Sequence, residues 1–210
     1  MKLVIFGASG GTGSQLLKQA LSRGHRVTAF VRNPAKLNLT TDALSVVKGD
    51  VLDRQSVATA IRSDDQAVLS ALGSMTLGYT NVVSRGTKNI LAAMTGFGVR
   101  RFVCMSAAGF HDDADDGTSM RLVKSILERI FKKPYADLER METIVRGSDA
   151  EWTIVLPSRL TNQPSNGTWH REIDRGVRNG WSVSRSSVAD CMLDLLEDPA
   201  TFHHDVYVSD

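Results

Sequence analysis

The sequence predicts an α/β fold, in which a doubly wound parallel sheet is covered by helices on both faces. Segments with strand and helix character alternate along most of the 210 residues, and such alternation is typical of right-handed strand–helix–strand crossovers. The first strand is expected at Lys2–Phe6, and apolar residues then repeat at helical spacing from Leu16 to Leu21. A glycine-rich turn lies between them. A strand, a glycine-rich turn and a helix in this order predict a Rossmann-type sheet with a dinucleotide site.

The glycine-rich turn reads GASGGTG over residues 7–13. Glycines permit a tight turn and let backbone amides approach a pyrophosphate, and the helix that follows supplies unpaired N–H groups at its positive end. Two hydroxyl groups add further donors. The residues of this turn expected to bind the cofactor are Gly7, Ser9, Gly10, Gly11, Thr12 and Gly13. The alternative is a turn that serves only the close packing of the helix on the strand.

The end of the second expected strand, Arg26–Val31, indicates which dinucleotide binds. An NAD site usually has Asp or Glu here, whose carboxylate accepts a hydrogen bond from the ribose 2′-hydroxyl. This chain has Arg32, with Lys36 four residues later. A guanidinium can hold a 2′-phosphate with two hydrogen bonds, whereas a carboxylate would repel it. The sequence therefore favours NADP(H) over NAD(H), with a solvated loop arginine as the alternative for Arg32.

Four further strands are expected from apolar runs at residues 44–48, 67–72, 101–105 and 152–156, the last closed by Pro157. Helices are expected near residues 54–62, 80–96, 120–131 and 136–146. Ligands of such sheets bind beyond the carboxyl ends of the strands. One edge of the sheet should therefore carry Gly7, Arg32, Asp50, Gly73 and Ser106.

The C-terminal part is shorter and less regular, and we interpret it as a small appendage on the substrate side of a single domain spanning residues 1–210. Ser187 is expected to cap a last helix at residues 188–197, with Asp190 in a capping-box-like position. A short final strand is expected at residues 206–208. The aspartate-rich segment 109–117 lacks the ligand spacing of a calcium loop, so a solvated loop is expected there.

Composition argues against several classes of function. The formal net charge of +2 provides no broad basic face for nucleic acid. No apolar run approaches the length of a membrane span, and no signal-peptide pattern opens the chain. Cys104 and Cys191 form no CxxC pair and lie in apolar segments, which fits reduced core thiols in the cytoplasm. His203 and His204 have no other His or Cys near them in the sequence, so no metal is expected.

The tyrosines argue against one common catalytic route. Many nucleotide-dependent dehydrogenases use a tyrosine as general acid, with a lysine four residues later. At that spacing Tyr79 is followed by Val83 and Tyr135 by Glu139, and Tyr207 is almost terminal. Hydride transfer to a flavin or another conjugated acceptor needs no such pair, because the electron sink lies in the acceptor and solvent can deliver the proton.

Two residues at the expected edge are candidates for catalysis. Ser106 lies just past the fifth strand, where a nicotinamide carboxamide or a substrate would lie; the alternative is a serine that caps a turn. Arg159 follows the sixth strand and could pair with an anionic group of the substrate. The alternative for Arg159 is a structural ion pair.

Five short motifs accompany the ends of the first five strands: GASGGTG, VRNPAKL, GDV, ALG and MSAAG. Together they resemble the atypical short-chain dehydrogenase/reductases, in particular the NAD(P)H-binding, NmrA-like group that includes flavin and biliverdin reductases. The resemblance covers nearly the whole chain and continues through DLERMETIVRGSDAEWTIVLPSRL and VSRSSVADCMLDLL. Two positions depart from the group. Arg159 stands where its biliverdin reductases have a histidine, and Ser187 stands where aspartate is common.

The resemblance implies a set of contacts along the cofactor. These are Arg32 and Lys36 at the 2′-phosphate, Asp50 and Val51 at the adenine, Leu72 and Gly73 at the ribose and nicotinamide side, and Ser106 and Pro157 at the nicotinamide end. The implied activity is NADPH-dependent hydride transfer to a small planar acceptor, namely a flavin, a bilin or a quinone. The alternative is an NmrA-like redox sensor that binds NADP(H) without turnover. We expect a monomer or a weak homodimer, since the long helices fit ordinary packing as well as a dimer face.

Overall fold

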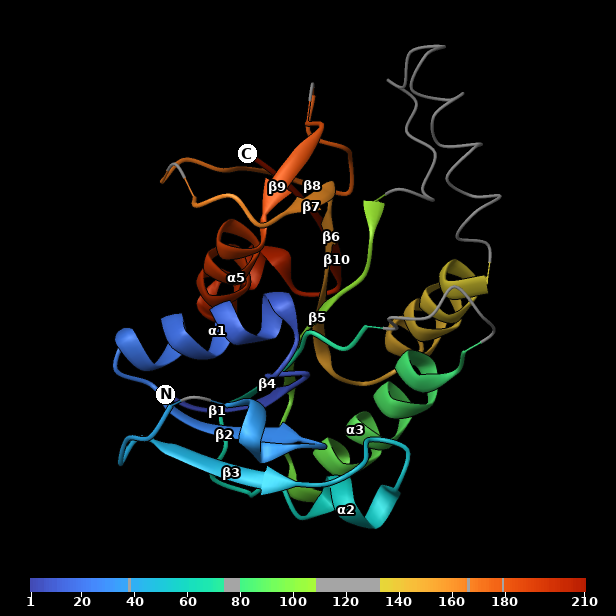
Figure 1. Ribbon diagram of the computed structural model, residues 1–210. Helices are drawn as coiled ribbons and strands as arrows, with labels where there is room; N and C mark the ends of the chain where they lie inside the picture. Colours follow the sequence, from blue (N-terminus) through green and yellow to red (C-terminus); the bar gives the residue numbers. More distant parts are fainter. Residues whose placement is uncertain (38, 74–79, 109–132, 166, 179) are drawn as a thin grey trace.

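An eight-stranded sheet forms the centre of the molecule (Figure 1). The computed structural model describes residues 1–37, 39–73, 80–108, 133–165, 167–178 and 180–210. In spatial order the strands are β3 (Leu44–Lys48), β2 (Arg26–Val31), β1 (Lys2–Phe6), β4 (Ala67–Ser70), β5 (Arg101–Met105), β6 (Glu151–Pro157), β10 (His204–Ser209) and β8 (His170–Ile173). Neighbouring strands pair in parallel, except that β8 runs antiparallel to β10. The order reverses between β1 and β4, so the predicted doubly wound Rossmann-type sheet is confirmed.

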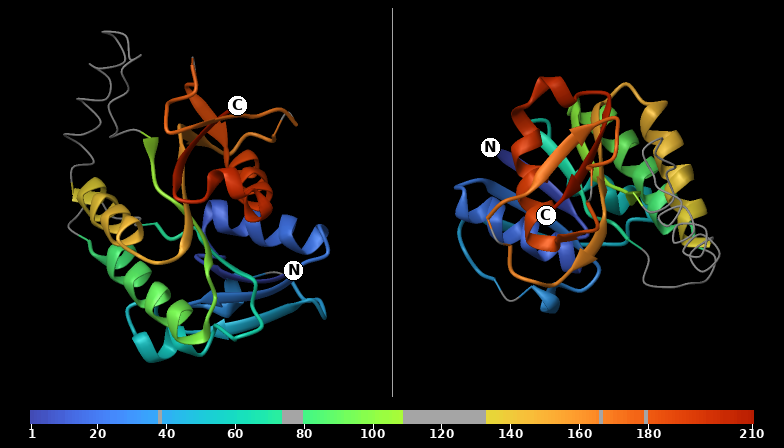
Figure 2. Two further views of the ribbon diagram at one scale, coloured as in Figure 1. Left: turned by 180° about the vertical axis from the view of Figure 1, so that it is seen from behind. Right: turned by 90° about the horizontal axis from the view of Figure 1, so that it is seen from above.

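Helices cover both faces of this sheet (Figure 2). One face carries α1 (Gly11–Ser22) and α5 (Arg185–Asp194), and the other carries α2 (Arg54–Ala58), α3 (Val82–Phe97) and the helix of residues 133–146. Short 3-10 turns lie at η1 (Pro34–Lys36), η3 (Leu195–Glu197) and η4 (Pro199–Thr201). Within the described part of the chain, no helix combines the length and the apolar character that a membrane crossing needs.

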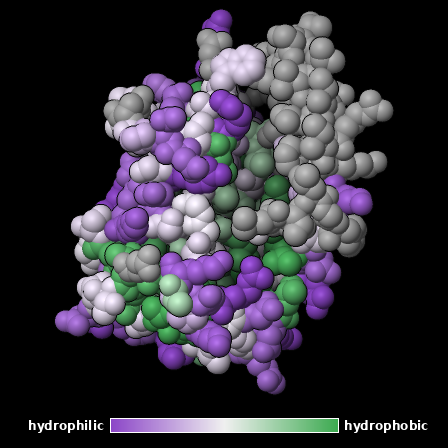
Figure 3. Space-filling view, viewed as in Figure 1, coloured by the Kyte–Doolittle hydropathy of each residue, from purple (hydrophilic) through white to green (hydrophobic). Residues whose placement is uncertain are grey.

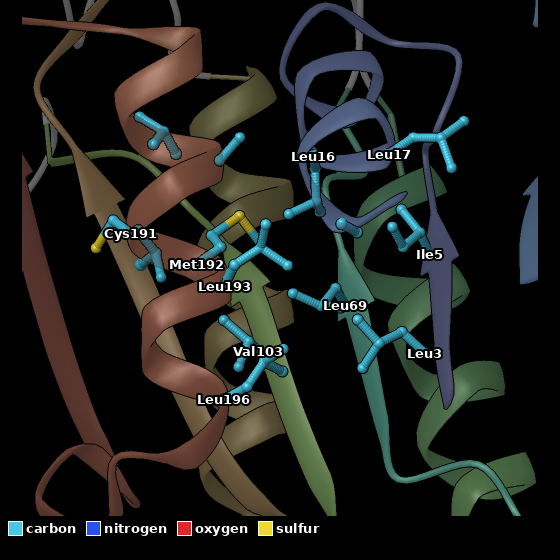
Figure 4. Packing of buried hydrophobic residues seen from close by; sticks show 14 of the residues in the cluster. Leu3, Ile5, Leu16, Leu17, Leu69, Val103, Cys191, Met192, Leu193 and Leu196 are labelled. Carbon is cyan, nitrogen blue, oxygen red and sulfur yellow. The ribbon is translucent and has the colours of Figure 1, made fainter. Parts of the chain in front are cut away.

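The two faces of β1 divide the hydrophobic core. Leu3 and Ile5 belong to the cluster beneath α1 and α5 (Figure 4), whereas Val4 and Phe6 belong to the cluster beneath α2 and α3. All four side chains are fully buried. Successive residues of a strand point to opposite faces, and a parallel strand covered on both faces is therefore apolar throughout. This is why β1 could be predicted from a run of apolar residues.

Several element ends differ from the prediction. β4 ends at Ser70 rather than at residue 72, and α3 begins at Val82 rather than at residue 80. α2 stops at Ala58 rather than at residue 62, because the chain turns at Thr59, whose hydroxyl donates to the carbonyl of Ser56 at 2.7 Å. The final strand is longer than predicted and runs over residues 204–209. The predicted helix at 136–146 is helical over residues 133–146. The acidic segment 109–117 and the predicted helix 120–131 lie outside the described residues.

The start of the last helix was predicted wrongly. Ser184, not Ser187, caps α5: its hydroxyl oxygen accepts the Ser187 N–H at 2.9 Å. Ser187 is instead fully buried in the first turn, and its hydroxyl lies 2.9 Å from that of Ser184 and 3.0 Å from that of Ser165. Asp190 takes no part in capping, because its carboxylate accepts hydrogen bonds from Arg23 and from the indole of Trp169.

Three short strands were not predicted. β7 (Arg159–Thr161) and β9 (Ser182–Ser184) pair in parallel as a separate small sheet, and β8 extends the main sheet beyond β10. In Figure 1 the small sheet lies above α1 and α5. The β7–β9 sheet lies in the part of the chain where the C-terminal appendage was predicted. The three strands escaped prediction because three or four residues with mixed polarity carry no clear periodic pattern.

A buried carboxylate joins the helix of residues 133–146 to α3. Asp137 is fully buried and accepts hydrogen bonds from the backbone N–H groups of Val83 (3.0 Å) and Ser84 (3.3 Å) and from the Ser84 hydroxyl (2.5 Å). The N-cap residue of α3, Asn81, makes no side-chain cap bond. Asp137 therefore satisfies the free N–H groups at the start of α3 from a distant part of the chain, and its charge complements the helix dipole.

We expect Asp137→Ala to lower the free energy of unfolding by about 2–3 kcal/mol, because a charged acceptor is removed from buried donors. Urea denaturation measures the change. Glu139→Ala is the matched control: it removes an exposed carboxylate from the same helix and should change stability by less than about 0.5 kcal/mol. Equal unfolding midpoints for the two variants would contradict this role of Asp137.

Candidate nucleotide-binding site

The parallel register brings the candidate residues to one edge of the sheet. Phe6 of β1 pairs with Ser70 of β4, Ser70 pairs with Cys104 of β5, and Met105 pairs with Val155 of β6. The residues just beyond these positions therefore lie side by side, although they are far apart in the sequence. From β3 to β5, the candidates that follow the strand ends are Asp50, Arg32, Gly7, Gly73 and Ser106, and Pro157 is the last residue of β6.

The glycine-rich turn after β1 is built on two close backbone approaches. Gly7 has a φ of +78°, and a Cβ added there would lie 2.5 Å from the carbonyl oxygen of Ala71. A Cβ at Gly13 would lie 2.0 Å from the carbonyl oxygen of Gly7. Only glycine fits either position. The turn therefore allows α1 to pack closely on the sheet, the role that the alternative interpretation of the glycines gave it. It also leaves Ser9, Gly10 and Gly11 exposed at the N-terminus of α1.

An arginine that the sequence analysis missed lies against this turn. A Cβ at Gly11 would be 2.7 Å from Arg185 Nε, so the missing side chain of Gly11 makes room for Arg185. The guanidinium donates through Nη1 to Asn162 Oδ1 at 2.7 Å. Arg185 opens α5, which packs beside α1. A positive charge thus lies beside the helix end that favours anions. No local pattern in the sequence places residue 185 there, because the last helix was predicted to begin at residue 188 and α5 begins at Arg185.

The edge beyond β2 and β3 carries exposed charged side chains, two of them basic. Arg32 and Lys36 are both exposed. The short turn η1 carries Lys36, and Asn33 caps it by accepting the Ala35 N–H at 3.1 Å. Asp50 is also exposed, and its carboxylate accepts the Leu52 N–H at 3.0 Å. This part of the edge can therefore meet an anionic group with two cationic side chains.

Val51 and Leu72 meet beneath α3. A Cβ added at Gly86 of α3 would lie 2.8 Å from Val51 Cγ2 and 3.2 Å from Leu72 Cδ1. The structure therefore brings these two predicted residues together, with Val51 buried and Leu72 half-buried. The Val51 carbonyl accepts a hydrogen bond from the Asn89 side chain at 2.9 Å. The two side chains form an apolar floor next to the exposed Gly73.

Ser106 is held by a buried carboxylate at the end of β5. Its hydroxyl donates to Glu142 Oε1 at 2.5 Å, and its N–H donates to the carbonyl of Val155 at 2.8 Å. Ser106 is 4% exposed and Glu142 is 2% exposed. The other oxygen of Glu142 accepts from Arg146 Nη1 at 2.9 Å, and Arg146 Nη2 donates to Asp205 at 2.7 Å. Four polar side chains thus run from the edge of the sheet to β10.

The sequence analysis did not identify Glu142 as a site residue, because its position in the sequence indicates only that it belongs to a helix. Burial by itself would lower the pKa of Arg146, but Asp205 and Glu142 outweigh burial and raise it. Asp205 and Glu142 therefore stabilise the charged form of the Arg146 guanidinium. The signal available in the sequence was the glutamate at an inward-facing position of the helix, where an unpaired charge would be costly.

Pro157 and Arg159 lie at the exit of β6. Pro157 is buried at the last position of the strand, and its register partner is Val208 of β10. Arg159 is exposed on β7, where it is the register partner of Ser182 in the small sheet. Among the described contacts, none joins Arg159 to Ser106. Its role therefore stays a prediction.

The two thiols are core residues, as expected. Cys104 is fully buried on β5 and Cys191 on α5, and neither forms a disulfide. Burial raises the pKa of both thiols, that of Cys191 to about 12. A protonated, inaccessible thiol is a poor nucleophile and a poor metal ligand.

The strand order, the glycine-rich turn and the edge together define a Rossmann-type nucleotide-binding protein. A family model described as NAD(P)H-binding matches residues 7–199. The chain belongs to this NAD(P)H-binding family. An uncharacterised chloroplast protein of Arabidopsis thaliana is 30% identical to it over 214 residues, which cover 96% of this chain and 74% of that protein.

Solved structures share the fold. The anaerobillin reductase ChuY of Escherichia coli O157:H7 aligns with a TM-score of 0.79 at 20% identity, over 100% of this chain and 97% of that one. A short-chain dehydrogenase/reductase of Veillonella parvula in complex with NADP aligns with a TM-score of 0.79 at 18% identity, over 100% of this chain and 94% of that one.

The glycine-rich turn gives a direct test of the site. We expect Gly13→Ala to lower the free energy of unfolding by about 1–3 kcal/mol, since backbone atoms must move to admit the methyl group, and to abolish NADPH binding. Gly96→Ala is the control, because a Cβ there meets nothing within 4 Å and alanine favours the helix. Calorimetric titration and thermal unfolding report the two effects. Normal NADPH binding by the Gly13 variant would refute the site.

Proposed function

We propose that this protein is an NADPH-dependent oxidoreductase that transfers a hydride to a small conjugated acceptor, namely a flavin, a bilin or a quinone. The observation that carries the proposal is the single sheet edge that brings together the glycine-rich turn, two exposed cationic side chains and the buried Ser106–Glu142 pair. Membership of an NAD(P)H-binding family supports the nucleotide.

The residues present fit this cofactor. The turn of Gly7 to Gly13 leaves no space for side chains at its closest approaches, and its exposed residues at the start of α1 would offer backbone amides to a pyrophosphate. We assign Arg32 and Lys36 to the 2′-phosphate, and Arg185 to the pyrophosphate beside Gly11. Asp50 and Val51 would border the adenine. Leu72 and Gly73 would border the ribose.

At the reactive end of the proposed site, the residues of the chain orient the nicotinamide and the acceptor and exclude water from them. When bound, NADPH supplies the hydride from C4 of its nicotinamide. Ser106 orients the nicotinamide end, Pro157 closes the edge beside it, and Arg159 attracts an anionic substituent of the acceptor. Figure 3 shows hydrophobic residues gathered in a hollow near the middle of this face, which suits a planar acceptor. A conjugated acceptor takes the electrons itself, so the chain needs no tyrosine–lysine pair.

A second candidate is an NADP(H)-binding redox sensor without turnover. The observation that favours it is the sequence itself, in which no tyrosine is followed by a lysine four residues later. In either case the free, buried thiols of Cys104 and Cys191 fit a reducing compartment, and the cytoplasm is the compartment that we propose.

NADPH consumption at 340 nm tests the proposal, with FMN, riboflavin, biliverdin and simple quinones as acceptors and NADH in parallel. We expect sustained turnover with NADPH and at least one of these acceptors. Tight binding of NADPH without turnover over the whole panel would favour the sensor. A protein that binds neither dinucleotide would refute both functions.

Two arginine variants test which phosphate group of the cofactor each arginine binds. We expect Arg32→Ala to weaken NADPH binding about tenfold to a hundredfold, because a charge-assisted contact to the 2′-phosphate is lost, and to leave NADH binding nearly unchanged. Arg185→Gln should weaken both dinucleotides by similar factors, since both carry the pyrophosphate. Fluorescence titration measures the four dissociation constants.

Arg100→Gln is the control for these variants, because Arg100 is an exposed arginine at the opposite edge, before β5. It should change neither affinity. If Arg32→Ala weakened the binding of NADPH and of NADH by equal factors, the assignment of the 2′-phosphate to Arg32 would be contradicted.

A further inference from the structure

We propose that Glu142 is a positioning residue that makes Ser106 a hydrogen-bond acceptor for the carboxamide N–H of the nicotinamide. This inference rests on the proposed nucleotide site. It goes beyond that site by assigning a direction to one hydrogen bond and by naming the chemical group on the ring that the bond selects.

The direction follows from the partners of Glu142. Arg146 donates to its Oε2 at 2.9 Å, and that ion pair keeps Glu142 a carboxylate, which can only accept. The Ser106 hydroxyl lies 2.5 Å from Oε1 and must therefore donate its only proton to Glu142. The lone pairs of the Ser106 oxygen are all that remains for a ligand. Burial of both residues protects this arrangement from water.

The edge of the sheet determines what meets these lone pairs. Ser106 directly follows β5, which lies next to β4 and two strands from the phosphate-binding turn after β1. This is where the proposed cofactor places its nicotinamide. A carboxamide has two N–H donors and one carbonyl acceptor. An oxygen that can only accept will bind the N–H side, and so determines how the carboxamide lies in the site.

A cofactor analogue with a ketone in place of the carboxamide tests whether Ser106 accepts a hydrogen bond from the carboxamide N–H. The 3-acetylpyridine analogue of NADP⁺ keeps the carbonyl but has no N–H donor. Beside Ser106 it would leave a buried acceptor without a partner and place two oxygens together. We expect the wild-type protein to bind this analogue about tenfold more weakly than NADP⁺, the effect of one lost hydrogen bond.

Glu142→Gln should reverse the direction of the bond. Arg146 would attract the carbonyl oxygen of the new side-chain amide, which turns the NH₂ group of that amide toward Ser106. The Ser106 oxygen then accepts from this NH₂ group, and its own proton becomes free to donate to a ketone or to a carboxamide carbonyl. The ratio of the two dissociation constants should fall to about one, although the site keeps its shape.

The experiment measures binding of NADP⁺ and of its 3-acetylpyridine analogue by calorimetric titration, with thermal unfolding recorded for every variant. Four proteins are compared: the wild type, Ser106→Ala, Glu142→Gln and the control Glu139→Gln, which alters an exposed carboxylate on the same helix. The expected ratio is about tenfold for the wild type and the control, and about one for the other two variants. A merely structural role would change both affinities together and leave the ratio unchanged.

A wild-type ratio near one, or a Glu142→Gln variant that keeps the wild-type ratio, would overturn the inference. Should Glu142→Gln fail to fold, Ser106→Ala still decides: an unchanged ratio overturns the inference, and a ratio near one supports it. A wild-type protein that binds NADP⁺ with the expected ratio but reduces no acceptor supports the inference and refutes only the reductase. A wild-type protein that binds neither compound refutes the nucleotide site and the inference together.

Discussion

The close packing of the glycine-rich turn is the constraint on which the rest of the site depends. The chain leaves β1 directly under the carbonyl of Ala71, and α1 begins against the carbonyl of Gly7, at distances where a Cβ would overlap backbone atoms. Because no side chain separates them, α1 lies flat on the sheet and its N-terminus points at the carboxyl edge. The same turn leaves Ser9, Gly10 and Gly11 exposed at the N-terminus of α1, and such a helix end favours anions.

The second helix on that face depends on the first. Gly11 has no side chain, and the space is filled by Arg185 from the start of α5. Arg185 is in turn held by Asn162, which follows β7 in the appendage. The C-terminal appendage is thus connected to the glycine-rich turn through one guanidinium. The last helix of the chain therefore contributes a residue that packs against a turn beginning at the seventh residue.

The other face of the sheet contains two buried carboxylates. Asp137 and Glu142 come from the same helix, and each is placed where donors would otherwise be unsatisfied: the first turn of α3 for Asp137, and the Ser106 hydroxyl for Glu142. A buried charge is tolerated only when it is paired, and Arg146 pairs with Glu142 through one nitrogen and with Asp205 of β10 through another. The helix of residues 133–146 therefore stabilises the fold at one point and orients a polar group of the edge at another.

The sequence by itself determined the sheet, the turn and the family resemblance, because those signals are local: apolar runs mark β1, β2 and β5, and glycine spacing marks the turn. It also placed the candidates Arg32 and Ser106 at a shared edge, since parallel strands end together. Only the tertiary structure decided the strands of the appendage and the partners of Gly11 and Ser106. Each of these depends on a contact between residues far apart in the chain, and a hydrogen bond across such a distance leaves no periodic trace in the sequence.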